Sequence, residues 1–484
     1  MEFTELADYP LPAGTVTEWV PVAHSAAWQF DDRPLSYNHQ DHCERTDPTT
    51  PDTENSWIGA VFEVPLRFDE QALRTTLTRW TARHESFRTT AGAAVDDHGD
   101  LVITRYTCPA EDITIESTTI GPIHSKMRVH QHICDFFGTN LTPMHWPHCL
   151  VATVSDTDLT RADEAFLLIF GADHSVLDAY SMLLAVSEIQ RIYRSVTLGD
   201  APELPTVGSY LDYAVVDRGL GEQLHLDHPV VSTWRHYLNR CGGGFPLFPL
   251  SVTPRNPRPE ARDHTDLHQS GLSSWVLSAE ETDVLERRCR DLGHSIHTAA
   301  LATLAATNAI LTDEAEPLRF AMPMHTRHDA AHVHAMGWYV GIVPIEIDLS
   351  ADEDLHDRLT HTATAVRAAK SLARYPYPRV ARLLANASTP KFVVSYLDVR
   401  HVPDAAEWQG WNVRPLRSGE RSDDEVYFWI ARSPAGMAIS ARFPSNEVAA
   451  ANVHRFINTF SAQLSSAATT EPTPSRSSSV LESR

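Results

Sequence analysis

The sequence predicts an α/β protein made of two lobes, with a ligand site between them. A chain of 484 residues is too long for one ordinary hydrophobic core, so about two domains are expected. Segments with strand-like and helix-like periodicity alternate in both halves of the chain. Because the cleft between two lobes is a common place for a ligand, the functional site is expected there.

The composition indicates a folded globular protein and excludes nucleic-acid binding. Hydrophobic residues make up 42% of the chain and charged residues 21%, which is typical of soluble domains. The net charge of −23 leaves no basic surface that would neutralise phosphates. No stretch reaches the roughly 20 apolar residues of a membrane span, and the acidic start lacks the features of a signal peptide. We therefore expect a cytoplasmic enzyme.

Histidine and cysteine raise the question of a metal site. The six cysteines contain no C-x-x-C pair, which favours free thiols over a disulfide framework or a zinc knuckle. One short window holds several potential ligands, namely His130, His132, Cys134, His145, His148 and Cys149. A metal site would need these side chains to converge with supporting partners, whereas such clusters arise readily in a chain with 26 histidines. We predict no metal.

The first half of the chain reads as strand, helix and strand, followed by a buried strand and a second helix. SWIGAVFEV (56–64) and LVITRYT (101–107) have the composition of strands, and DEQALRTTLTRWTARH (69–84) repeats apolar residues at helical spacing. EAFLLIFGA (164–172) is a continuous apolar run, as expected for a strand buried on both faces. An amphipathic helix is predicted from Ala179 to about Arg194.

The pattern loosens between residues 201 and 270, where proline and charge accumulate. We therefore predict an N-terminal lobe at 1–215, a linker or crossover at 216–270 and a C-terminal lobe at 271–466. The end of the chain, 467–484, is rich in Ser, Thr and Pro and is expected to be disordered.

The second lobe repeats the mixture of helices and strands. Ser278 and Glu281 form an S-x-x-E capping box, and Gly293 is expected to end the helix that follows. SIHTAALATLAATNAILT (295–312) predicts a second helix, and residues 354–373 predict a third. The strands expected around them are LRFAMPM, YVGIVPIEID, KFVVSYLDV, EVYFWIA and MAISARF.

The junction DHSVLD (173–178) lies between the buried strand and the helix after it, and it places His174 four residues before Asp178. The same H-x-x-x-D spacing recurs at His325 and Asp329, so the spacing alone does not identify a catalytic pair. Only the first pair lies between a buried strand and a helix, whereas the second lies in a polar loop. Asp178 also suits a helix N-cap, which is a structural explanation for that carboxylate.

Three segments resemble the condensation-domain superfamily, which includes the condensation domains of nonribosomal peptide synthetases and chloramphenicol-acetyltransferase-like enzymes. DHSVLDAYS resembles its H-H-x-x-x-D-G motif, RHESFRT (83–89) its R-H-E-x-L-R-T motif, and MGWYVGIVPIEI (336–347) its V-G-x-F-x-N-T-x-P-L-R segment. They occur in the order of that superfamily. The resemblance implies two chloramphenicol-acetyltransferase-like lobes in a V-shaped arrangement with the active-site channel between them.

Other stretches resemble the stand-alone polyketide-synthase-associated (Pap) acyltransferases of mycobacteria and related actinobacteria, especially their trehalose-esterifying branch. They are PLSYNHQDH, GSYLDYA, GGGFPLFPL, HTRHDAAHVHAMGWYVGIVPIEI and EVYFWIARSPAGMAISARFPSN. This resemblance implies transfer of an acyl group from acyl-CoA or a carrier-protein thioester to a free acceptor. Coenzyme A would be a co-substrate, no bound cofactor would be needed, and a carrier protein of a polyketide synthase or peptide synthetase is a possible partner.

Two positions depart from the family motif. Asp173 stands in place of the first histidine, and Ala179 in place of the glycine. The first histidine is generally structural in the superfamily, and the trehalose-esterifying branch resembles this chain in having D-H-x-x-x-D-A. We therefore expect activity to be retained.

The resemblance also implies roles for individual residues. His174 would be the general base, a role that an imidazole with a reference pKa near 6.5 suits at neutral pH. No covalent acyl-enzyme is required, and no G-x-S-x-G or Cys/His arrangement is present. Asp178 would pair with Arg327 and shape the loop through a charge-assisted bond. The alternative for Arg327 is a solvated arginine in a loop.

Residues that could line the substrate channel come mostly from the segment MGWYVGIVP. Its glycines would let the backbone approach a ligand and its aromatic rings would line the channel, although a strand packed in a core explains the same residues. Ser395 and Tyr396, in VVSYLD, are weaker candidates for which packing in the core is favoured. The channel candidates are Ala179, Gly337, Trp338, Tyr339, Gly341 and Ser395.

Three functions remain open from the sequence. The first is an acyltransferase that acts on a hydroxyl, with a sugar such as trehalose or a natural-product alcohol as acceptor. The second is a free-standing condensation enzyme that forms an amide, because the same base serves either nucleophile. The third is a non-catalytic docking protein that keeps the fold.

Overall fold

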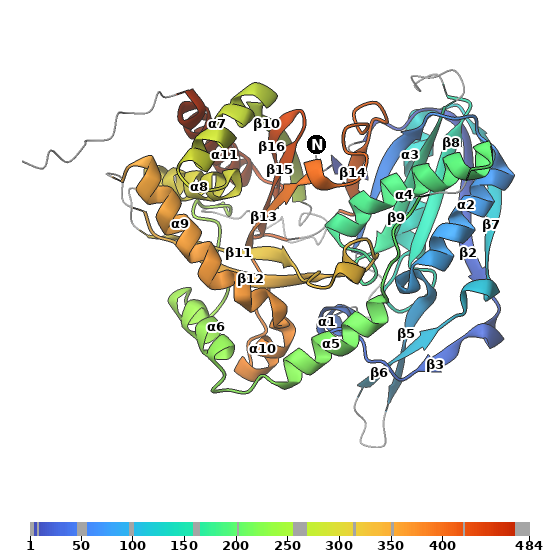
Figure 1. Cartoon of the computed structure of the whole chain (residues 1–484), viewed down its shortest axis with the longest axis horizontal. Helices are drawn as coiled ribbons and strands as arrows, with labels where there is room; N and C mark the ends of the chain where they lie inside the picture. Colours follow the sequence, from blue (N-terminus) through green and yellow to red (C-terminus); the bar gives the residue numbers. More distant parts are fainter. Residues whose placement is uncertain are drawn as a thin grey trace, which may run out of the picture.

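Two β-sheets form the cores of two lobes that lie side by side in the computed structural model (Figure 1). The structure describes residues 4–6, 9–45, 56–95, 101–157, 165–200, 203–254, 269–312, 316–349, 353–419 and 422–469. The mixture of sheets and covering helices confirms the predicted α/β class.

The first lobe contains a seven-stranded sheet in the order β1-β14-β4-β9-β8-β2-β7. Its strands are β1 (Thr4–Glu5), β2 (Gly14–Ala23), β4 (Trp57–Val64), β7 (Ile113–Ile123), β8 (Cys149–Ser155), β9 (Phe166–Asp173) and β14 (Arg414–Arg417). A smaller sheet pairs β3 (Gln29–Asp31), β6 (Leu101–Thr107) and β5 (Thr89–Val95). All residues of β9 are buried, as its continuous apolar run predicted. The strand that leads to DHSVLD is therefore held inside the sheet.

Helices cover both faces of this first sheet. Side chains of α2 (Glu70–Arg83) and α4 (Ala179–Leu198) pack in one hydrophobic cluster with one face. Side chains of α3 (Lys126–Asn140) pack in a second cluster with the opposite face. The first sheet is thus the middle layer of a three-layer lobe.

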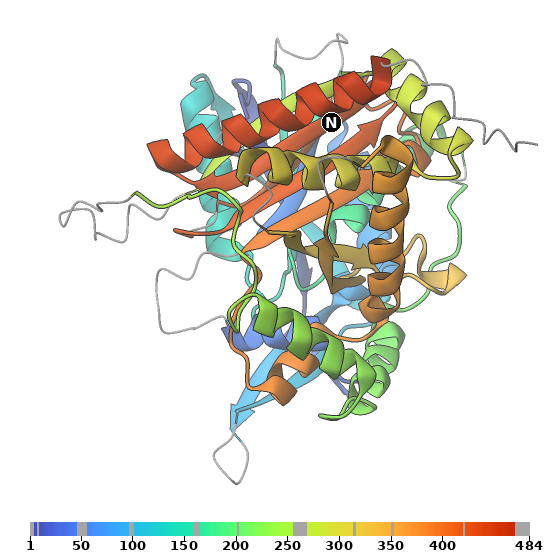
Figure 2. The same cartoon turned by 90° about the vertical axis from the view of Figure 1, so that its left-hand side faces the viewer.

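The second lobe contains a six-stranded sheet in the order β10-β16-β15-β13-β11-β12. Its strands are β10 (Gln269–Ser278), β11 (Leu318–His325), β12 (Val340–Ile347), β13 (Phe392–Asp398), β15 (Val426–Ser433) and β16 (Gly436–Pro444). Figure 2 shows helices lying across the sheet, and they share one core with it. The helices that contribute to this core are α6 (Pro229–Arg240), α7 (Ala279–Asp291), α8 (Ile296–Thr312), α9 (Leu355–Lys370), α10 (Tyr377–Leu384) and α11 (Glu447–Thr469).

Local capping rules place several helix ends where the sequence predicted them. Ser278 and Glu281 make both hydrogen bonds of the capping box at the start of α7. Gly293, just after the end of α7, has a positive φ of 79°, which glycine adopts at little cost. Asp69 caps α2, and Asp178 caps α4 by accepting a hydrogen bond from the backbone N–H of Ser181.

The chain crosses between the lobes in a way that periodicity did not predict. β14 follows four strands of the second sheet in sequence, yet it joins the first sheet, where it pairs with β4 and β1. The segment predicted as a linker contains the end of α5 (Tyr210–Glu222) and all of α6 (Pro229–Arg240). α11 extends to Thr469, into the predicted tail, and the remainder of that tail lies outside the described residues. The proposed domain boundaries themselves stay a prediction.

Helix α1 (Tyr37–Arg45) is fixed at the junction of the lobes beside α5 (Figure 1). The carboxylate of Asp217 accepts a hydrogen bond from the backbone N–H of Tyr37 at 2.7 Å. The amide of Asn38 donates to the carbonyl oxygen of Val340, on β12, also at 2.7 Å. Gly221 lets α5 approach closely, because a Cβ there would lie 2.2 Å from the ring of Tyr37. α1 is therefore held by α5 on one side and by β12 of the second lobe on the other.

Candidate active site

The turn DHSVLD is fixed by its own backbone and by Asp173. The N–H of His174 donates to the carbonyl oxygen of Ser56 at 3.0 Å, and that of Val176 donates to the carbonyl oxygen of Asp173 at 3.1 Å. The Asp173 carboxylate accepts from the N–H of Ser175 at 2.9 Å. Asp173 is fully buried, whereas His174 is only partly buried. A rigid turn therefore presents the imidazole.

Asp178 and Arg327 form a bidentate ion pair between the lobes. Nη1 and Nη2 of Arg327 lie 2.7 and 3.1 Å from the two carboxylate oxygens, and the side chains are only 4% and 2% exposed. The same carboxylate accepts from the N–H of Ser181 at 2.7 Å and from that of Tyr339 at 3.0 Å. Asp178 thus both caps α4 and anchors the second lobe, and Arg327 is not a solvated loop residue.

Ser181 belongs to the same network, although the sequence analysis did not single it out. Its hydroxyl accepts from Nη2 of Arg327 at 2.5 Å and lies 3.0 Å from the carbonyl oxygen of Gly337, to which it donates. Arg327 also donates to the carbonyl oxygen of Ala335 at 3.2 Å and lies over the ring of Tyr339 at 4.2 Å. The one sequence signal was its place in DHSVLDAYS, one turn after Asp178. Because the network is buried, removing one member would leave a charge or donor unpaired.

The ring of Trp338 contacts His174, and the ring of His42 contacts Trp338 in turn. The ring of Trp338 lies 4.2 Å from that of His174, with an angle of 36° between the planes. His42, on α1, meets the same Trp338 edge-on at 5.7 Å. Burial lowers the pKa of His174, and the nearby positive charge of His42 acts in the same direction. A neutral imidazole, which can accept a proton, is therefore favoured.

The rest of the segment MGWYVGIVP packs between structural elements. A Cβ at Gly341 would lie 1.9 Å from the carbonyl oxygen of Ala373, and one at Gly337 would lie 2.5 Å from the ring of Tyr210. Tyr339 is fully buried in a cluster with Tyr210. The two glycines thus have a packing reason that the sequence did not reveal. Channel lining stays a prediction, and Trp338 is the member of the segment that contacts the His174 ring.

Within the described residues, the structure shows no hydrogen bond or ring contact between the remaining channel candidates and the ring of His174. Ala179 is the first residue of α4, and Ser395 lies on β13; both are partly buried. Tyr396 has its ring 4.6 Å from that of His297 and packs against the core of the second lobe, in agreement with the core explanation.

His84, in the segment RHESFRT, ties three parts of the molecule together. Its Nε2 lies 2.6 Å from a carboxylate oxygen of Glu188 on α4. Its Nδ1 accepts a hydrogen bond from the backbone N–H of Met336 at 3.3 Å. This motif histidine therefore supports the segment that carries Trp338 and does not itself join the His174 contacts.

The histidine and cysteine window does not form a compact ligand cluster in the part of the chain that the structure describes. His130, His132 and Cys134 lie on α3, whereas His148 is buried and bonded to the carbonyl oxygen of Thr142 and the hydroxyl of Thr90. Across the described residues, no three side chains of metal-ligand type converge. The helices within those ranges include none that is long and apolar enough to cross a bilayer.

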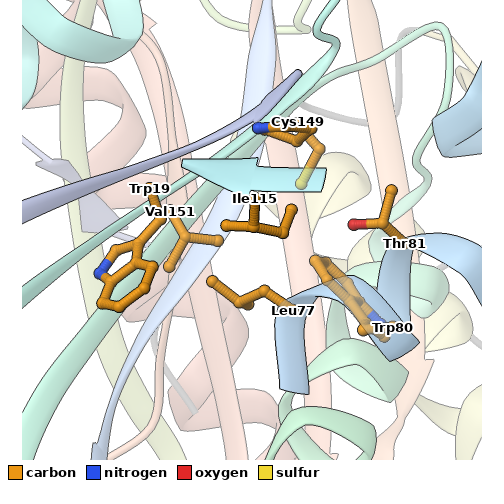
Figure 3. A pocket seen from close by; sticks show the side chains of 8 residues that line it. Trp19, Leu77, Trp80, Thr81, Ile115, Cys149 and Val151 are labelled. Carbon is orange, nitrogen blue, oxygen red and sulfur yellow. The ribbon is translucent and has the colours of Figure 1, made fainter. Parts of the chain in front are cut away.

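A small apolar hollow lies elsewhere in the first lobe, between α2 and the first sheet (Figure 3). Its lining residues include Trp19, Leu77, Trp80, Ile115 and Val151. None of the DHSVLD residues lines it, so it is separate from the candidate active site.

The profile of the condensation domain matches residues 48–477, and the chain belongs to this family. Among solved structures, the fold is similar to that of "PapA2 acyl transferase", with a TM-score of 0.82 and 21% identity over 97% of this chain and all of that one. It is also similar to the condensation domain of the Monacolin K polyketide synthase MokA, with a TM-score of 0.68 and 17% identity over 90% and 97% of the two chains. Both likenesses support the predicted two-lobe fold.

Two curated relatives indicate which class of protein within this family the chain is similar to. Acyltransferase PapA3 of Mycobacterium tuberculosis is 24% identical over 476 residues, which cover 93% of this chain and 95% of that protein. The 2'-acyl-2-O-sulfo-trehalose (hydroxy)phthioceranyltransferase PapA1 of Mycobacterium bovis is 25% identical over 415 residues, which cover 82% and 74%. The chain is accordingly an acyltransferase similar to the Pap proteins of mycobacteria.

Proposed function

We propose that this acyltransferase moves an acyl group from a thioester to a hydroxyl of a sugar, with His174 as the general base. The observation that carries the proposal is the imidazole of His174, presented on a rigid turn, kept neutral by its surroundings and supported by the buried Asp178–Arg327 pair. The name of PapA1 describes transfer to an acylated sulfo-trehalose. A trehalose-type sugar is therefore our proposed acceptor class.

The chemistry requires only one proton carrier beside two bound substrates. As the acceptor oxygen attacks the thioester carbonyl carbon, its proton passes to His174. When the tetrahedral intermediate collapses, the C–S bond breaks and the imidazolium returns that proton to the departing thiolate. The ester and the free thiol are the products. The protein's main contribution is to hold the hydroxyl and the thioester in place next to the imidazole.

Asp178 and Arg327 act in this proposal as positioning residues. Their ion pair is buried, and both carboxylate oxygens are occupied by donors, so this carboxylate is not the base. The donor is coenzyme A-bound or carrier-protein-bound acyl, and a synthase carrier protein is the partner expected in the second case. We place the reaction in the cytoplasm.

Mass spectrometry of reaction mixtures tests the proposal. Purified wild-type protein and His174→Ala are incubated with acyl-CoA and carrier-bound thioesters, together with trehalose, simple alcohols and amines. The matched control is His325→Ala, which removes the exposed histidine of the second H-x-x-x-D sequence. We expect His174→Ala to lose about 10²- to 10⁴-fold in rate, as for removal of a general base, and His325→Ala to keep wild-type activity.

Each other result has a defined meaning. Equal rates for wild type and His174→Ala would contradict the assignment of the base. Products formed from amines alone would favour amide formation. Absence of any product from wild type with both kinds of donor would favour the non-catalytic docking protein.

A further inference from the structure

We propose that His42 is a positioning residue for His174, which it influences through the Asp173 carboxylate and through its own charge. The proposal rests on His174 being the base of the proposed reaction. It assigns a function to helix α1, whose sequence YNHQDHCER lies far from DHSVLD along the chain.

His42 contacts the residue that precedes the base. Its Nε2 lies 3.2 Å from one carboxylate oxygen of Asp173 and 3.4 Å from the other. The Asp173 side chain is 0% exposed, so no solvent reaches this carboxylate. A buried carboxylate needs a charged or hydrogen-bonding partner, and the His42 imidazole supplies one.

Asp173 passes this contact on to the turn. The carboxylate oxygen nearest to His42 also accepts from the N–H of Ser175 at 2.9 Å. The backbone N–H of Asp173 donates to the carbonyl oxygen of His148 at 2.8 Å. His174 therefore lies between two residues whose positions depend on the same carboxylate. Loss of the His42 contact would free the turn at the point where it carries the imidazole.

Trp338 forms a second connection between the two histidines. The ring of Trp338 lies 4.2 Å from His174 and 5.7 Å from His42, edge-on to the latter. Since α1 is held by Asp217 and by Val340, His42 is presented from a fixed helix. The geometry thus joins α1, the DHSVLD turn and the segment before β12 around one indole ring.

His42 and Asp173 also shift each other's pKa values, in addition to holding the turn in place. Burial by itself would lower the pKa of His42, but Asp173 raises it above its usual value. Burial would likewise raise the pKa of Asp173, yet His42 holds it well below its usual range. Both pKa shifts favour an imidazolium beside a carboxylate, and the charge of this imidazolium disfavours protonation of His174.

Other ionisable groups also face the two histidines. The charges of Asp173, Asp41 and Arg45 shift the pKa of His42. The charge of His42 in turn lowers the pKa values of His39, His148 and His174. The charges that act on His174 are those of His42, Asp173 and Asp178. The carboxylates favour the protonated form of His174, whereas burial and the charge of His42 disfavour it, so a neutral residue at position 42 removes one of the two opposing effects. The pKa of His174 should then rise.

The experiment compares His42→Gln with wild type and with His42→Ala. Glutamine can still donate a hydrogen bond to Asp173 but carries no charge, whereas alanine loses both. His361→Gln on α9 is the matched control, because it removes another histidine that pairs with a carboxylate, that of Glu353 at 3.0 Å. Acylation of His174 by diethyl pyrocarbonate is followed from pH 5 to 8 by peptide mass spectrometry, which reports the neutral imidazole without any substrate.

In His42→Gln we expect the labelling midpoint of His174 and the acid limb of kcat/KM to move to higher pH together, by about one unit. The plateau of kcat/KM at high pH should stay within roughly threefold of wild type, because the hydrogen bond to Asp173 remains. His42→Ala should show the same shift and lose about tenfold or more on the plateau, since the turn is also freed. His361→Gln should change neither quantity.

An unchanged His174 midpoint in a folded His42→Gln protein would overturn the proposal. So would failure of His42→Gln to fold, since His42 would then be a structural residue only. The labelling readout separates this proposal from the proposed function. If His174→Ala kept full activity, the assignment of the base would fail, while the labelling midpoint would still report whether His42 controls the protonation of His174.

Discussion

The two H-x-x-x-D sequences of this chain have the same spacing and different environments. His174 follows the buried strand β9, and Asp178 caps α4 while it binds Arg327. His325 is the exposed last residue of β11, and Asp329 is exposed at the start of the short 3₁₀ helix Ala330–His332. The flanking elements, and not the spacing, therefore decide whether such a histidine and aspartate are held in place by their surroundings.

The second sequence nevertheless contributes to the first. Arg327 lies between His325 and Asp329 in the chain, and its guanidinium reaches across to Asp178. The segment from His325 to Asp329 is therefore needed for its arginine, while its histidine and aspartate stay at the surface.

The largest effect is expected from removing the two aspartates in turn. Asp178→Ala leaves a buried arginine without its partner, so the free energy of unfolding should fall by about 3–5 kcal/mol. Asp329→Ala removes an exposed cap of a single 3₁₀ turn and should cost no more than about 1 kcal/mol. Urea denaturation measures both. Equal losses of unfolding free energy would show that the buried ion pair contributes no more to stability than the exposed cap.

A smaller effect is expected from changing the geometry of the cation and keeping its charge. Arg327→Lys loses the bidentate bond to Asp178 and one or both of the bonds to Ser181 and Ala335, so the free energy of unfolding should fall by about 2 kcal/mol. Arg290→Lys, on the exposed surface of α7, is the matched control and should change it by less than about 0.5 kcal/mol. Thermal and urea denaturation of both variants decide the point. If Arg327→Lys left the free energy of unfolding unchanged, charge alone would be sufficient to hold the lobes together here.

The smallest effect is expected in the pH dependence of the wild-type enzyme. Burial lowers the pKa of His174, so the neutral base is favoured down to below its reference pKa of about 6.5. As pH falls, kcat/KM should stay level and decline only through this lowered pKa, with more than about half of the plateau left at pH 6.5. His325→Ala should give the same profile. A midpoint above 6.5 in wild type would contradict the assigned environment of His174.

Local elements could be predicted from the sequence because their determinants are local. The capping box at Ser278, the positive φ at Gly293 and the buried run of β9 each depend on residues within a few positions of one another. The strand-to-helix junction at His174 followed from the same short-range patterns. The resemblance to a family then supplied an order of motifs, which local patterns cannot.

Long-range placement could not be predicted in the same way. Periodicity gives no sign that β14 would leave the second half of the chain to join the first sheet, since strand pairing depends on partners far away in sequence. The helix of residues 210–222 was also not predicted. It contacts α1 on one side and the second lobe on another, so its apolar residues do not form the single face that helical periodicity reveals.

For the candidate site, the sequence by itself determined which side chains are present and that His174 follows a buried strand. Tertiary structure decided which of them meet: Arg327 with Asp178, Ser181 with Gly337, and His42 with Asp173. The physical reason is that a buried charge is stable only beside a partner, and here the partners come from elements that only folding brings together. The same principle explains why His325 and Asp329, which are exposed to water, do not require a charged partner from another element.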